Sequence, residues 1–221
     1  MQLLDRIEKR RFVGREFLLW LWFEIEIFQA TLATAAHGRF GLWIEKDILL
    51  SAGKEVTRIK GMMPAASREA KEALLLGKLP ERAGFHLSWR EEESSFAIKG
   101  EPLALVGLAL PTVLGGAEDE GPVDLGPKRA PRRARPTTVE QDAEREQDDR
   151  SEVFYERMRL TRDIEGLVEA LYADFLGLRL GPAWDGLVVP TMRAWSQSKP
   201  VDETAYRRGR SEILGKRSAA A

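Results

Sequence analysis

Apolar residues are most concentrated at residues 12–23, where the chain reads FVGREFLLWLWF. Gly14 suits a helix N-cap, Glu16 falls in the first turn where the helix dipole favours an acid, and apolar residues then follow on every face. We predict a helix buried in the core. Seven consecutive apolar residues exceed one stripe, so a dimer or partner face is the alternative for its aromatic residues Phe17, Trp20, Trp22 and Phe23.

The pattern changes after this block. On a helix Glu24 and Glu26 would lie about 200° apart, so they could not share one solvent face, and the alternation favours a strand here or an early helix end. Residues 40–50 predict a hairpin around a Lys46-Asp47 turn. The alternation over residues 56–60 then predicts a third short strand.

The next segments predict a helix and a second hairpin. Ser67 is a good cap for a helix over residues 67–76, and Gly77 suits its end. Apolar residues alternate over 85–89 and again over 96–98, with a turn predicted at 91–93. Residues 103–110 are apolar and strand-like.

The second half of the chain predicts helices. From residue 151 to 180 apolar residues recur every three or four positions, which indicates a long amphipathic helix ended by Gly181-Pro182. Residues 184–195 predict a second helix or turn, broken at Pro190. The apolar stripe either docks on the protein's own sheet or binds a partner.

Between these halves, residues 112–150 lack aromatic residues and are rich in proline, glycine and charge, which predicts a disordered linker. The fold class is therefore α+β: a small, mostly antiparallel sheet packed with the Trp-rich helix, followed by a long amphipathic helix. The predicted organisation is an α+β module (1–111), the linker (112–150), a helical arm (151–198) and a disordered basic tail (199–221).

The residues that carry common chemistry are missing or isolated. The chain has no cysteine, and neither His37 nor His86 has metal-ligand spacing. No phosphate loop or nucleophile elbow is found. The prediction is a non-enzymatic protein without metal, cofactor or small-molecule substrate. The short apolar block is interrupted by acids, which argues against a membrane span, and the lack of cysteine fits a reducing cytoplasm.

The best candidate for a binding site is a basic cluster inside the linker. Five cations there could contact a phosphate backbone. If all five did so, the logarithm of the binding constant would fall against the logarithm of the salt concentration with a slope of only about −4 to −5. Acidic runs on both sides favour the alternative, a solvated linker. The basic tail adds a second candidate contact. The candidate nucleic-acid contacts are Lys128, Arg129, Arg132, Arg133 and Arg135 in the linker, and Arg207, Arg208 and Arg210 in the tail.

Several segments together resemble a known family. They are FVGREFLLWLW at 12–22, FGLWI at 40–44, LGK at 76–78 with RA at 82–83, FYERM at 154–158 and LGLRL at 176–180. These segments resemble the C-terminal half of RdgC-like recombination-associated proteins. The resemblance implies DNA binding. Members of that family form dimeric rings around duplex DNA and restrain the recombinase RecA.

This chain starts at the tryptophan block, without the half that precedes the block in the family, so encirclement of a duplex is not carried over. No DNA-contact residue of the family maps onto the sequence either. The expected function is a non-enzymatic accessory protein in DNA recombination or maintenance that binds DNA or a recombination partner. The alternative is a protein-interaction module, as a homodimer or with another protein, that never touches DNA.

Overall fold

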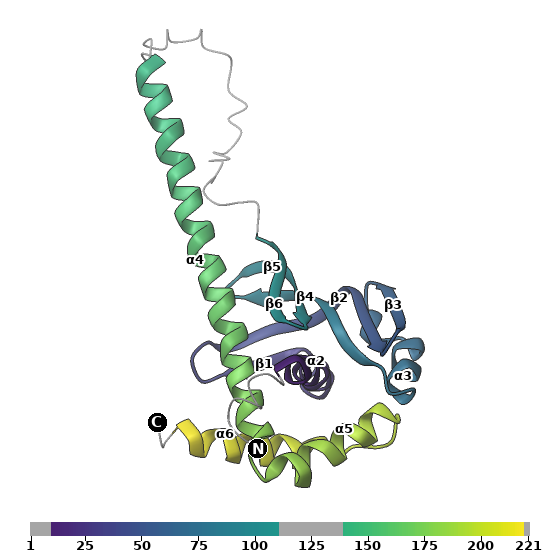
Figure 1. Cartoon of the computed structure of the whole chain (residues 1–221). Helices are drawn as coiled ribbons and strands as arrows, with labels where there is room; N and C mark the ends of the chain where they lie inside the picture. Colours follow the sequence, from purple (N-terminus) through teal and green to yellow (C-terminus); the bar gives the residue numbers. More distant parts are fainter. Residues whose placement is uncertain (1–9, 111–138, 219–221) are drawn as a thin grey trace, which may run out of the picture.

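The computed structural model describes residues 10–110 and 139–218, and Figure 1 shows their arrangement. The described strands form one antiparallel sheet, and α2 and the long helix α4 pack on the sheet. The predicted α+β fold is confirmed. The strands are β1 (Thr31–Thr34), β2 (Gly38–Ala52), β3 (Glu55–Gly61), β4 (Leu79–Trp89), β5 (Glu92–Gly100) and β6 (Leu103–Ala109).

The strand order is β1-β2-β4-β5-β6, and β3 also pairs with β2. Because β4 occupies one edge of β2, β1 and β3 share the other edge. There β1 pairs with residues 38–41 and β3 with residues 46–52. A gap therefore separates β1 from β3 along this edge.

The predicted hairpin turn at Lys46-Asp47 is wrong, because β2 runs straight through it. Lys46 has a φ of +69°, and the register with β4 shifts between Ile44 and Ile48. These are the marks of a β-bulge, which turns the strand locally without ending it. The chain reverses instead at residues 53–54, where Gly53 has a φ of +61°.

The other predictions for this half need only small changes. Helix α3 (Arg68–Leu75) follows the 3-10 turn η1 (Pro64–Ala66), and the Ser67 hydroxyl caps it by accepting the Ala70 N–H at 3.1 Å. β4 and β5 form the second predicted hairpin. Their turn lies at residues 90–91 rather than 91–93, since both of those residues have the positive φ that a tight hairpin turn requires.

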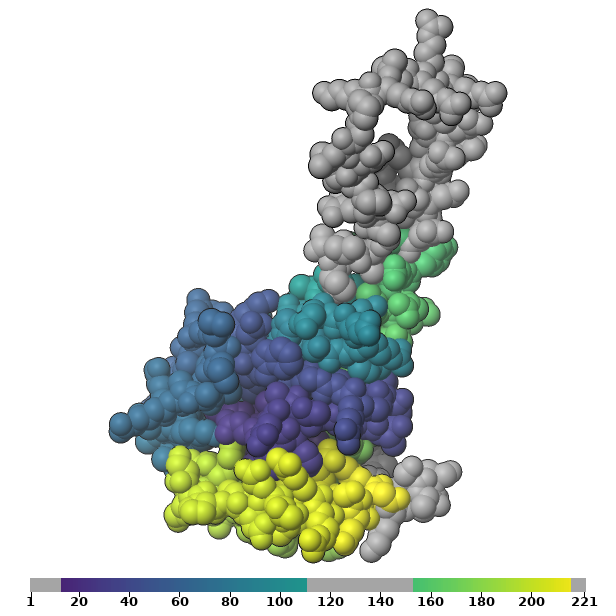
Figure 2. All heavy atoms as spheres, turned by 180° about the vertical axis from the view of Figure 1, so that it is seen from behind, coloured from purple at the N-terminus to yellow at the C-terminus, as the bar shows by residue number. Residues whose placement is uncertain are grey.

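Helix α2 (Arg10–Ile27) carries the aromatic block. It begins before Gly14 and continues through residues 24–26, so the predicted cap and the strand alternative are both wrong. In Figure 1 α2 is seen end-on beneath the sheet, and in Figure 2 the C-terminal helices cover its other side. This position between two layers explains apolar residues on every face: Phe17, Trp20, Trp22 and Phe23 are each 0% exposed.

Gly14 has a packing role inside this helix. An added Cβ at Gly14 would come within 2.1 Å of the Gly100 carbonyl oxygen at the end of β5. Only a residue without a side chain allows the two backbones to approach so closely.

The C-terminal half contains α4 (Val139–Arg179), a π-helical turn (Trp184–Val188), α5 (Val189–Ser196) and α6 (Glu203–Ser218). α4 begins twelve residues before position 151, so the end of the predicted linker is helical; residues 112–138 of it lie outside the described residues. The predicted apolar stripe packs against the rest of the chain, as shown by the buried side chains of Ile164, Leu171 and Phe175. Phe154 and Met158, one end of that stripe, are 60% and 42% exposed.

The tail was predicted to be disordered, and this is wrong for residues 203–218, which form α6. Tyr206 anchors the helix: it is fully buried, and its ring lies 4.9 Å from that of Phe23 in an edge-to-face contact. The α+β module and the helical arm consequently share one hydrophobic core.

Candidate nucleic-acid interface

Helix α6 is held to α2 by a buried polar cluster around Glu24. Arg210 Nε lies 2.7 Å from Glu24 Oε2, and the Tyr206 hydroxyl donates a hydrogen bond to the other carboxylate oxygen. Asp174 on α4 lies 3.8 Å from the same guanidinium. Burial raises the pKa of the fully buried Glu24, while Arg210 opposes that rise. The cluster thus sets the position of the arginines on α6.

Next to this cluster lies a pocket of about 320 Å³ that three arginines line together. Arg39 comes from β2, and Arg207 and Arg210 come from α6, one turn apart. Phe28 and the β1 residues 31–33 complete the lining. None of the lining residues is an acid, so the lining itself contributes only positive charge.

The three guanidinium groups are held differently. Arg207 donates to the Ile27 carbonyl and to Glu203 at 3.2 Å. The guanidinium groups of Arg207 and Arg210 lie over the Phe28 ring, at 5.1 and 5.2 Å from its centroid. The Nε of Arg207 is buried and has no hydrogen-bond partner among the described residues. Arg39 is exposed and forms no ion pair within the described part of the chain.

This arrangement suits an anion. Arginine offers a planar set of donors that matches the oxygens of a phosphate or carboxylate. Arg210 is compensated by Glu24 and serves as a fixed wall, whereas Arg39 is exposed and the Arg207 side chain is 40% exposed, so both can reach a ligand. The pocket can therefore hold an oxyanion.

The structure separates the residues predicted from the sequence. Arg207 and Arg210 meet in the pocket, while Arg208 is exposed and does not line it. The linker cluster at residues 128–135 lies outside the described residues. Arg39 was missed, because an isolated arginine at the start of a strand carries no local signal; only the pairing of β1 with β2 places it opposite α6.

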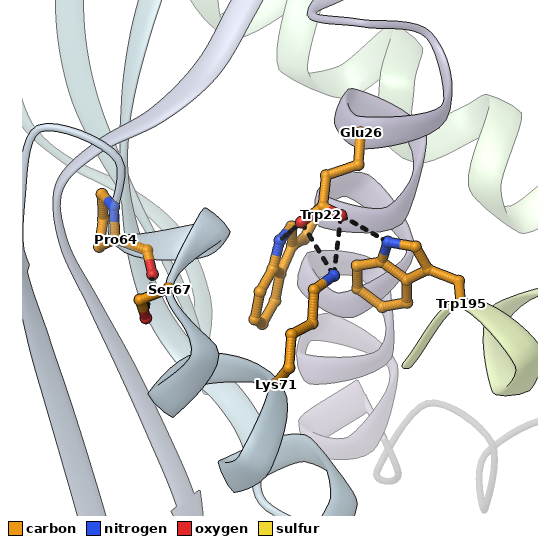
Figure 3. Close-up of polar contacts among 6 residues, drawn as sticks. All are labelled: Trp22, Glu26, Pro64, Ser67, Lys71 and Trp195. Atoms are coloured by element: carbon orange, nitrogen blue, oxygen red, sulfur yellow. Dashed lines mark hydrogen bonds and ion pairs between the residues drawn. The ribbon is translucent and has the colours of Figure 1, made fainter. Parts of the chain in front are cut away.

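A second polar cluster surrounds Glu26, which lies two residues further along α2 (Figure 3). Its carboxylate accepts hydrogen bonds from the indole N–H groups of Trp22 and Trp195, at 2.6 and 2.7 Å, and from Lys71, at 2.8 and 3.0 Å. The Lys71 ammonium also lies 3.5 Å from the Trp195 ring centroid. These contacts tie α3 and α5 to α2.

The Glu26 cluster is a structural joint. The donors and acceptors that meet there already satisfy one another, so a substrate would have to displace them. Burial lowers the pKa of Lys71, and the Glu26 carboxylate counteracts this by stabilising the charged ammonium. Figure 3 also shows Ser67, whose hydroxyl donates to the Pro64 carbonyl at 2.9 Å and so joins η1 to α3.

The remaining predicted features are simple to place. His37 contacts Thr34 in the turn after β1, and His86 lies on the sheet face opposite that of the buried Phe85 and Leu87. Across residues 10–110 and 139–218 no cluster of three or more His, Cys, Asp or Glu side chains could hold a metal ion. Within the same ranges no helix is both long enough and apolar enough to cross a membrane.

Comparisons of the chain with known protein families, with curated proteins and with solved structures find no match. The RdgC-like resemblance therefore rests on the sequence segments given above.

Proposed function

We propose that this protein is a non-enzymatic, RdgC-like accessory protein in DNA recombination or maintenance, and that it contacts the DNA backbone through the arginine pocket. The observation that carries the proposal is the convergence of Arg39, Arg207 and Arg210 on one acid-free pocket. Arginines directed at a shared site are the usual partners of phosphate oxygens. The resemblance to a DNA-binding family supports the same ligand.

The test is fluorescence anisotropy of labelled DNA titrated with the full chain at several salt concentrations. For the wild-type protein we expect saturable binding that weakens with salt. Arg39→Glu and Arg207→Glu should weaken binding to every sequence equally, and each should reduce the salt slope by about 1. Arg68→Glu is the matched control, since Arg68 lies on α3, away from the pocket, and its side chain is 92% exposed.

The linker cluster supplies a rival contact for the same ligand. A variant with Arg129, Arg132, Arg133 and Arg135 changed to glutamate separates the two. If this variant loses DNA binding while Arg39→Glu keeps it, the contact lies in the linker and the pocket assignment is wrong. If the wild-type protein binds no DNA even at low salt, the DNA-binding function itself is refuted.

The second candidate function, a protein-interaction module, is favoured by one observation. Phe154, Tyr155 and Met158 form an exposed apolar patch on α4, and their exposed fractions are 60%, 71% and 42%. Such a patch on a helix that has left its own core is a common partner site. Light scattering tests the simplest version, self-pairing: Phe154→Glu should convert a dimer to a monomer, and a wild-type monomer at high concentration would exclude it.

A further inference from the structure

A second pocket lies in the gap between β1 and β3 on the edge of β2. Residues 43–45 have no strand partner on that edge within the described chain, and a pocket of about 560 Å³ lies against them. Its lining is mostly apolar and comes from the end of α2, from β2 and from the segment before η1. The main apolar lining residues are Ile25, Trp43, Ile44, Met62 and Met63.

The exposure of this lining points to a ligand. Met62 and Met63 are 85% and 71% exposed and line one pocket with Trp43, and an apolar patch of this kind marks a binding site. Methionine is flexible and polarisable, so a pair of them can adapt to a flat aromatic partner. The Trp43 ring itself is held in place, because it stacks on His86 with 4.7 Å between the ring centroids and an interplanar angle of 26°.

The acids near this pocket are already engaged. Glu45 lies 3.3 Å from His86 Nδ1, and Glu26 accepts the donors of its own cluster. The Glu26 charge is paired with that of Lys71, whereas Glu45 and Glu93 share His86, which offsets a negative charge only when its imidazole is protonated. What the pocket offers is an aromatic surface in a lining that also holds two exposed methionines.

The apolar pocket and the arginine pocket are neighbours. Phe28 and Thr31 line the arginine pocket, while Gln29 and Ala30, between them in sequence, line the apolar one. On β2, Arg39 and Trp43 point to the same sheet face, and four strand residues span about 13 Å. Gly41 lies between them, and the Trp43 ring extends over it: an added Cβ at Gly41 would come within 2.9 Å of Trp43 Cζ3.

We propose that the two pockets form one binding site for single-stranded DNA, with a backbone phosphate at Arg39 and Arg207 and an unpaired base stacked against Trp43. Positive side chains beside an aromatic surface are the general way in which proteins bind single strands. The bases of a duplex are already paired and stacked, so they cannot reach Trp43 without being extruded. This inference rests on the proposed DNA-binding function and adds a preference for single strands.

The test compares a labelled single strand with a duplex of the same sequence. Trp43→Ala should weaken single-strand binding about tenfold, within the range seen when one base–aromatic stack is removed. It should leave duplex binding unchanged, and Trp43→Phe should restore most of the affinity because a phenyl ring also stacks. Circular dichroism of each variant shows whether the fold is kept.

A surface variant makes the test independent of Trp43. Met63→Glu changes a side chain that is 71% exposed, so the fold should persist, and it places a negative charge at the pocket. It should selectively weaken single-strand binding. Leu76→Glu is the matched control, because Leu76 is 74% exposed and lies outside the pocket.

The outcomes separate the inference from the function on which it rests. Equal affinity for single strand and duplex in the wild type, or unchanged single-strand binding by Trp43→Ala and Met63→Glu, overturns the inference while the arginine pocket can still bind DNA. If those variants bind single strands normally but lose a peptide or protein partner, the pocket is a protein-docking site and the inference is wrong. If no DNA binds at all, the proposed function fails with it.

Discussion

Two carboxylates near the end of α2 show how differently the same residue type is used within one turn of a helix. Glu24 faces α6 and is fully buried, with Arg210 and the Tyr206 hydroxyl as its partners. Glu26 faces α3 and α5, its side chain is 32% exposed, and its partners are Lys71 and two indole N–H groups. Each joins α2 to a different part of the chain.

The difference lies in how each charge is compensated. Water still reaches the Glu26 carboxylate. Two neutral indole N–H groups donate to it in addition to the Lys71 ammonium, so the loss of one partner leaves others in place. Glu24 has no contact with water, and its charge depends on Arg210. A buried ion pair contributes little net stability when intact but is costly to break from one side. We therefore expect the α6 joint to be the more fragile one.

The largest effect should come from Glu24→Ala. This change leaves the Arg210 guanidinium, whose side chain is only 12% exposed, without its closest counter-charge. The free energy of unfolding should fall by about 3–5 kcal/mol in urea denaturation. Glu16→Ala is the control on the same helix: Glu16 is part-exposed and pairs with Arg179 at 2.7 Å, so its loss should cost about 0–1 kcal/mol. Equal losses from the two variants would contradict the comparison.

A smaller effect is expected from Lys71→Met in the Glu26 cluster. Methionine preserves the apolar stem between Trp22 and Trp195, and Glu26 keeps both indole donors. The free energy of unfolding should change by less than about 1 kcal/mol, which is the scale of a part-exposed ion pair. A loss as large as that of Glu24→Ala would show that the ammonium, rather than its stem, holds this joint together.

The smallest effects concern how the free energy of unfolding changes with pH. The sign of this change differs between the Glu24 cluster and the Glu26 cluster. Burial raises the pKa of Glu24 above its ordinary 4.5, so the folded protein binds this proton more tightly, and its contribution to stability falls as the pH rises from about 4.5. Burial lowers the pKa of Lys71 below its ordinary 10.5, so the unfolded chain binds that proton more tightly, and stability rises as the pH approaches 10.5.

Urea denaturation at a series of pH values gives the free energy of unfolding as a function of pH, and so measures both slopes. Glu24→Gln should remove the fall in stability above pH 4.5, and Lys71→Met should remove the rise below pH 10.5. If either variant keeps the slope of the wild-type protein, another group causes it.

Local patterns determined much of the fold. Ser67 and Gly77 delimit α3 because a cap and a left-handed terminator act within a few residues. Alternation over 85–89 and 96–98 gave the correct inward faces of β4 and β5, since strand geometry has a period of two. The aromatic block was correctly predicted to be a buried helix, because apolar residues on all faces require cover on all sides.

Only the tertiary structure decided where the polar residues of α2, β2 and α6 lie. Glu24 and Glu26 cannot share one solvent face of a helix, which argues against a helix if both need water. In the structure Arg210 and Lys71, distant in sequence, are their partners instead. The charged composition of the tail predicts disorder, and only the tertiary structure places Tyr206 in the core. The arginine pocket depends on the same long-range packing. Arg39 and Arg207 are 168 positions apart, so no local sequence pattern predicts that they lie side by side.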